Sequence, residues 1–300
     1  MSVVLEKDRL RVVLCLCGVL SCVAGHASPQ PPQAPQAPKP PQAPKTPPPL
    51  SAPRASMKGV FLEDLTWVEA EKRLGPDTVV VIPLGAGAKE HGPHLLLKND
   101  LLLADYFKRR VGAEADVVIA PTVNYSYYPA FLEYPGSTSL RLETARDVLV
   151  DICKSLAAYG PKRFYVLNTG VSTLRALKPA AALLAQDQIL LRYTDLGKLL
   201  GPIEKQVAKQ EGGTHADEIE TSMMLYIAPE TVDMKRAVKD YDPTPGGGLT
   251  RTRGGKGAYS PTGIWGDPTL ATREKGERVV EAFVKGLLQD IEELRQAALP

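Results

Sequence analysis

The segment KEHGPHLLLKND (residues 89–100) places side chains that can bind a metal ion close together in the chain. Glu90 and His91 are adjacent, and Asp100 follows nine residues after His91. A divalent ion prefers imidazole and carboxylate ligands, and it lowers the pKa of a bound water toward about 7. Such a water can attack an unreactive amide at neutral pH. We therefore predict that Glu90, His91 and Asp100 are metal ligands.

A second segment, THADEIETS (residues 214–222), has the same kinds of side chain. His215 and Glu220 could complete the coordination of the ion, or they could form a pair that transfers protons. We expect Glu220 to join the metal ligands and His215 to be the catalytic residue.

The distribution of histidines supports a shared site. The chain has four histidines; His26 lies in the N-terminal segment, and the other three all lie in these two clusters. A single histidine is more often a cap or a packed side chain than a ligand. Three histidines beside several carboxylates favour a functional role for His91 and His215, and we expect His94 to support the site from behind the ligands.

Strand-like and helix-like patterns alternate along the chain after residue 56. Short apolar runs rich in β-branched residues predict strands at 78–84, 116–121, 163–168 and 188–195. Amphipathic or apolar-periodic segments predict helices at 99–112, 142–160, 173–186, 215–228 and 273–298. This alternation is typical of an α/β fold in which helices cover both faces of a mostly parallel sheet.

This topology places the first cluster where ligands bind. Residues 89–94 follow the first predicted strand, and open α/β sheets form their ligand crevices at the carboxyl ends of strands. The loop after the second strand carries Tyr125, Tyr127 and Tyr128, which could either line a substrate pocket or pack within the loop.

Composition excludes some partners. The formal net charge is +2, and no long basic tract indicates a nucleic acid as partner. No run of about 20 apolar residues in the body of the chain indicates a membrane span. Cys153 is the one cysteine after the N-terminal segment, so no disulfide is expected within a mature chain, and its helical spacing among apolar residues predicts a core position.

The N-terminal residues have the pattern of an export signal. A charged start is followed by an apolar stretch that ends in small residues, so we expect a signal peptide at 1–27 that is cleaved after Ala27. Lipid attachment at Cys22 and an uncleaved anchor are alternatives. Residues 28–55 are rich in Pro, Gln and Ala and predict an extended linker to a domain at 56–300. The mature protein would then be periplasmic or extracellular.

Four segments in order resemble the creatininase (creatinine amidohydrolase) family. They are IPLGAGAKEHGPHLLLKND, YPGSTSL, GGTHADEIETS and TGIWGDPTLATREKGE, and the resemblance covers about residues 59–294. It implies a three-layer αβα sandwich and a metal-dependent hydrolase that acts on cyclic or linear amides. It also implies a homo-oligomer, often built from dimers.

The resemblance assigns roles to individual residues. His91 matches a metal-binding histidine of the family, and Asp100 matches its metal-bridging aspartate. His215 matches the histidine that assists proton transfer, and Glu220 matches the glutamate of a Glu-Thr-Ser triplet.

The sequence departs from the family at two places. Lys89 stands where the family has a ligand glutamate, so the carboxylate of this loop must come from Glu90. After the third strand, NTGVST places Gly170 and Ser172 where creatininase has a histidine and a glutamate ligand. We therefore expect one divalent ion per chain rather than two, with Ser172 among the residues that contact substrate.

Three functions remain open from the sequence. The favoured one is an exported metal-dependent amidohydrolase that opens a C–N bond of a small amide, lactam or formamide. Zinc is the expected ion, with manganese or iron as alternatives. The second is a relative that binds a metal or ligand but has lost catalysis. The third is a metal-free hydrolase that uses His215 with Ser172 or Thr173.

Overall fold

The computed structural model describes residues 57–243 and 248–300. The expected signal peptide and the whole of the expected linker lie outside the described residues. Within those two ranges, no helix combines the length and the apolar character that a membrane crossing requires.

A parallel sheet of five strands forms the centre of the domain. Its order is β1-β3-β2-β4-β5, and every neighbouring pair is parallel. The strands are β1 (Val60–Phe61), β2 (Val79–Leu84), β3 (Val118–Ile119), β4 (Arg163–Asn168) and β5 (Leu190–Tyr193). All six residues of β2 are buried, as expected for a strand that is covered on both faces.

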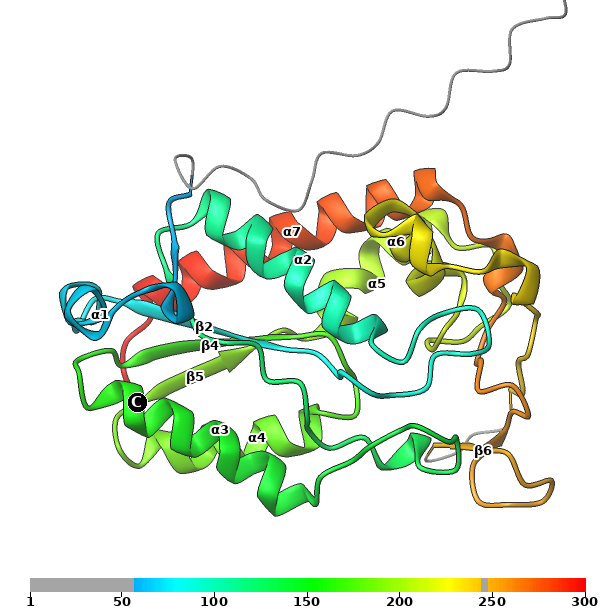
Figure 1. Ribbon diagram of the computed structural model, residues 1–300, viewed down its shortest axis with the longest axis horizontal. Coiled ribbons are helices and arrows are strands. Elements are labelled where there is room, and N and C mark those ends of the chain that lie inside the picture. The colour runs from blue at the N-terminus through cyan, green and yellow to red at the C-terminus, as the bar shows by residue number, and fades with distance from the viewer. Residues whose placement is uncertain (1–56, 244–247) are drawn as a thin grey trace, which may run out of the picture. The chain divides into compact units, whose positions relative to one another are not determined.

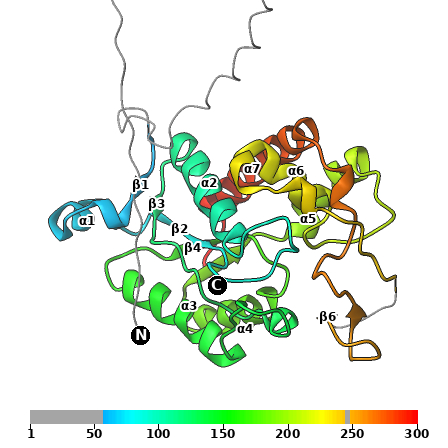
Figure 2. The same ribbon diagram turned by 45° about the vertical axis from the view of Figure 1, so that its right-hand side comes forward.

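Helices cover the two faces of the sheet (Figures 1 and 2). On one face lie α3 (Leu142–Ala157) and α4 (Leu174–Ala185). On the other lie α2 (Asn99–Glu114), α5 (Leu196–Val207), α6 (Glu218–Ile227) and α7 (Arg273–Gln296). A short α1 (Trp67–Arg73) precedes β2. The strands β6 (Leu249–Thr250) and β7 (Ala258–Tyr259) form a second, two-stranded sheet and precede α7 in the chain.

Successive residues of a strand point to opposite faces, and this alternation builds two cores. Val79 and Val81 of β2 pack into the core shared with α2, α6 and α7. Val80 and Ile82 pack into the core shared with α3 and α4, where Cys153 is fully buried as predicted. The structure therefore confirms the α/β fold with three layers and a parallel central sheet.

Several elements differ from the sequence prediction, including three short strands (β1, β6 and β7), two helices and the start of α6. The helices α1 and α5 were not predicted, and α5 contains an internal proline, Pro202. The helix predicted from residue 215 begins at Glu218, because the side chain of Asp217 accepts hydrogen bonds from the backbone N–H groups of Ile219 and Glu220. His215 therefore lies in the segment before the helix.

Candidate active site

The loop between β2 and α2 carries the first cluster. The end of β2 lies beside the end of β4, since Leu84 pairs with Asn168, and the loop begins at this edge of the sheet. Gly92 has φ = 69°, a conformation that L side chains rarely adopt, and a Cβ there would meet Ile264 and His94. This turn brings His91 back toward the first turn of α2.

The contacts of His91 fix the direction of its ring. Its Nδ1–H donates to the carbonyl oxygen of Lys89 at 2.8 Å, so Nε2 is the atom that faces the site. Nε2 lies 2.9 Å from Oδ1 of Asp100 and 3.4 Å from Oε1 of Glu220. Burial and the Lys89 ammonium act to lower the pKa of His91. The carboxylates of Asp100 and Glu220 outweigh them and raise the pKa to about 9.

A turn and the start of α6 position the second cluster. His215 and Trp265 form an antiparallel bridge, in which the N–H of Trp265 donates to the carbonyl oxygen of His215 at 2.9 Å. Glu220 lies in the first turn of α6. Its Oε2 accepts from the N–H of Ala216 at 2.7 Å, and its Oε1 accepts from Nδ2 of Asn99 at 2.9 Å.

The environment of Glu220 keeps this carboxylate charged. Burial alone would raise the pKa of Glu220, but the charges of His91 and His215 and the hydrogen bond with His91 lower it far below its usual range. Glu220 is therefore an anion between two imidazoles.

Glu90 contacts the second cluster from the first loop. Its Oε2 lies 3.1 Å from Nε2 of His215, and its Oε1 accepts from the N–H of Gly92. A Cβ at Gly263, where φ is 84°, would collide with the carboxylate of Glu90. The lack of a side chain at Gly263 is thus what makes room for the contact between Glu90 and His215.

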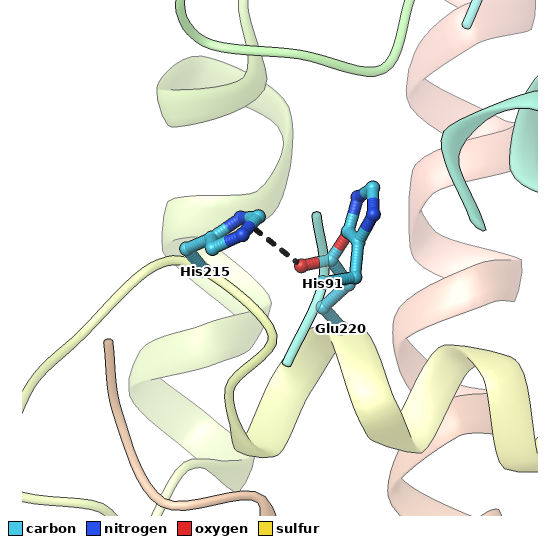
Figure 3. A group of neighbouring side chains, drawn as sticks. All are labelled: His91, His215 and Glu220. Atoms are coloured by element: carbon cyan, nitrogen blue, oxygen red, sulfur yellow. Dashed lines mark ion pairs between the residues drawn. The ribbon is translucent and has the colours of Figure 1, made fainter. Parts of the chain in front are cut away.

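Three of these side chains form a group that fits a divalent ion. One ligand atom each from His91, His215 and Glu220 lies within 4.8 Å of the others, and Figure 3 shows the two imidazoles on either side of the carboxylate. Two histidines and one glutamate are a ligand set of catalytic zinc sites. The hydrogen bond from Nδ1 of His91 to a carbonyl oxygen is the usual outer support of such a ligand.

Asp100 has a different neighbour. Its Oδ1 faces His91, but its Oδ2 forms an ion pair of 2.7 Å with the ammonium of Lys89. Asp100 and Glu90, which the sequence suggested as ligands, therefore lie next to the three-residue group and contact it through His91 and His215 respectively.

A cavity of about 290 Å³ opens beside this group. Lys89, His215 and Glu220 are among the residues that line it. Leu103, Phe107, Met223 and Phe283 provide apolar walls. A pocket with a few charged groups against an apolar wall is the usual form of a site for a small molecule.

The residues expected to contact substrate have different positions. Ser172 lines the cavity, whereas the described lining includes none of the three tyrosines. Tyr125 is exposed, and Tyr128 is buried with its ring 5.7 Å from the Lys89 ammonium. Phe131, three residues after Tyr128, lines the cavity, and its ring is tilted against that of His215 with ring centroids 4.5 Å apart.

The hydrogen bonds of the site do not favour a metal-free hydrolase in which His215 acts with Ser172 or Thr173. Thr173 directs its Oγ1 to Oδ1 of Asn168 at 2.6 Å and to the carbonyl oxygen of Gly170 at 2.5 Å. In residues 57–243 and 248–300, His215 makes its side-chain hydrogen bond with Glu90 rather than with Ser172 or Thr173.

His94 lies behind the group formed by His91, His215 and Glu220. Its Nε2 is 2.8 Å from Oγ1 of Thr221, the residue after Glu220, and burial lowers the pKa of His94 to about 4. Sequence reasoning did not anticipate Asn99, Phe131 or Gly263 in the site. The position of Asn99 directly before Asp100 at the start of a helix was the one available signal.

The chain is similar to a known family of hydrolases and to several of its members. Residues 63–291 match the family model for creatininase, described as creatinine amidohydrolase. The chain is 30% identical to the creatinine amidohydrolase of Pseudomonas putida over 79% of this chain and 97% of that protein. It is 31% identical to the mycofactocin precursor peptide peptidase of Mycolicibacterium smegmatis, over 69% and 82% of the two chains.

A solved structure has the same fold. The manganese form of creatininase superposes with a TM-score of 0.68 and is 26% identical, with coverage of 80% of this chain and 100% of that one.

Proposed function

The chain belongs to the creatininase family of hydrolases, and we propose that it uses one divalent ion to hydrolyse a C–N bond in a small amide, lactam or formamide. The observation that carries this proposal is the convergence of His91, His215 and Glu220 beside a largely apolar cavity. The ligand set favours zinc, and the manganese form of creatininase makes manganese the first alternative.

His91, His215 and Glu220 would hold the ion. When bound, such an ion polarises a carbonyl group and lowers the pKa of a water molecule. A single ion is proposed because Lys89 already occupies one oxygen of Asp100, and because Gly170 and Ser172 offer no imidazole or carboxylate at the end of β4.

The surrounding residues hold the ligands in position. Glu90 accepts from Nε2–H of His215, which leaves Nδ1 of that ring to face Glu220. The carbonyl oxygen of Lys89 holds the ring of His91, while Asn99 and the N–H of Ala216 hold the two oxygens of Glu220. This differs from the sequence-based expectation, in which His215 transfers a proton and Glu90 binds the ion.

The first experiment combines metal analysis with an amide panel. Protein purified without added metal is expected to contain about one divalent ion per chain by elemental analysis. It is then assayed against creatinine, cyclic amides, formamides and short peptides. Removal of the ion with a chelator is expected to lower turnover at least about 100-fold, and zinc is expected to restore it.

The outcomes separate the candidate functions. Turnover that survives complete removal of metal contradicts the proposal. A protein that binds one ion but hydrolyses no member of the panel supports the second function, in which a family member binds a metal but has lost catalysis. The lack of metal-binding side chains at Gly170 and Ser172 is the observation that favours this function.

The cellular location and assembly are also part of the proposal. The charged and then apolar start of the chain supports export, with a mature protein that begins near Ser28. Intact-mass measurement of the exported protein tests this, and a full-length cytoplasmic product contradicts it. A homo-oligomer is proposed from the family resemblance, and light scattering on the purified protein measures it.

A further inference from the structure

Lys89 is a buried cation inside the candidate site. The residue is 5% exposed, and its ammonium forms an ion pair with Asp100 at 2.7 Å. The ammonium also lies 4.7 Å from the ring centroid of Phe131 and 5.7 Å from that of Tyr128. A lysine is rarely buried to this extent unless an anion or an aromatic face compensates for the loss of water, and here both are present.

The main chain around Lys89 is held as firmly as its side chain. Its N–H donates to the carbonyl oxygen of Leu97 at 2.9 Å, and its own carbonyl oxygen accepts from His91. These bonds fix the root of the side chain on the loop that supplies His91. The ammonium is therefore a positioned charge rather than a mobile surface group.

The ammonium of Lys89 has N–H donors that are available to a bound molecule. An ammonium group has three N–H donors, and within residues 57–243 and 248–300 the carboxylate of Asp100 lies against it as an ion pair. The rings of Phe131 and Tyr128 attract the charge but accept no ordinary hydrogen bond. Lys89 lines the same cavity as His215 and Glu220, so an oxygen atom of a bound molecule can take up a remaining donor there.

We propose that Lys89 is a catalytic residue that binds the carbonyl oxygen of the substrate and the carboxylate of the product. This inference rests on the proposed amide hydrolysis. When water adds to the carbonyl carbon, the π pair of the C=O bond moves onto the oxygen, and this oxygen accepts an N–H hydrogen bond from Lys89 without taking the proton. The pair then re-forms the C=O bond as the C–N bond breaks, and the nitrogen leaves with a proton that came from the water.

Benzoate is a suitable probe because it combines a carboxylate with an apolar ring, as the walls formed by Phe107 and Phe283 require. Its affinity is measured by calorimetry for wild type and Lys89→Met, each in zinc-loaded and chelator-treated form, with zinc content determined in parallel. Loss of the ammonium is expected to weaken benzoate binding at least about tenfold in both forms. Zinc content is expected to stay near one ion per chain.

Two further variants make the result decisive. Lys89→Met leaves the buried Asp100 without its partner, so the double variant Lys89→Met/Asp100→Asn removes both charges and is expected to fold and to show the same weak benzoate binding. Lys108→Met is the matched control, because Lys108 is a buried lysine near the ring of Phe61 and outside the described lining of the cavity. It is expected to bind benzoate like wild type.

The inference is overturned if Lys89→Met or the double variant binds benzoate as tightly as wild type, or if wild type binds none in either form. Failure of the proposed function looks different. If the proposed function is wrong, the protein contains no zinc or hydrolyses no amide. In that case the difference in benzoate affinity between chelator-treated wild type and chelator-treated Lys89→Met still tests the role of Lys89.

Discussion

Replacement of Glu220 by glutamine is expected to lower the affinity for zinc at least about 100-fold and to abolish turnover of any substrate found in the amide panel. Glutamine keeps the size of the side chain and an oxygen for the N–H of Ala216. It removes the negative charge that lies between the rings of His91 and His215. Loss of a ligand is expected to cost more than the 10- to 100-fold typical of damage to its outer supports.

Equilibrium metal titration with a competing chelator measures this effect, and circular dichroism verifies the fold. Glu230→Gln is the matched control, because Glu230 is an exposed carboxylate just after α6. It is expected to leave zinc affinity unchanged. Zinc binding by Glu220→Gln at wild-type affinity would show that Glu220 is not a ligand.

Replacement of Gly276 by alanine is expected to give the largest loss of stability. Gly276 lies in α7, and a Cβ there would collide with the backbone carbonyl group of Ser222 in α6. The two helices are also joined by a hydrogen bond from the N–H of Thr272 to Oγ of Ser222 at 3.1 Å and by the ion pair of Lys275 with Glu218. Because backbone atoms cannot rotate away, the helices must separate.

We expect a loss of about 3 kcal/mol and a decrease of about 10 °C in Tm, measured by thermal unfolding. Zinc affinity should also fall, since Glu220 moves with α6. Gly286→Ala in the same helix is the control, because its Cβ meets the flexible end of Leu199 at 2.8 Å. A Tm near wild type in Gly276→Ala would mean that α6 and α7 can shift at little cost.

The sequence predicted four of the five strands of the central sheet, because the signal of these strands is local. The strands β2 and β4 are short apolar runs between helix-like segments, and both were predicted within one residue of their ends. The helix α5 was missed because Pro202 interrupts its pattern and few of its residues are buried. The short α1 was missed although Thr66 and Glu69 form a capping box at its start.

The site was harder to predict because its contacts join distant parts of the chain. His91 and Glu220 were predicted as ligands from residue type and spacing, and the structure brings both into one group with His215. The sequence analysis identified Lys89 only as the residue that stands in place of a ligand glutamate. Its contacts with Asp100 and Phe131 depend on how two loops pack, and no local pattern in the sequence indicates this.

The distance along the chain between the two halves of the proposed metal site also bears on how the protein would acquire an ion. Glu90 and His215, which contact each other in the site, are 125 residues apart in sequence. An unfolded chain therefore presents no preformed site, and the ligands meet only after β2, β4 and α6 have packed. Affinity alone would favour copper or zinc over manganese in any compartment. The ion that occupies the site is then decided by the pool of metals available where folding is completed, so an exported chain and the same chain retained in the cytoplasm can carry different ions.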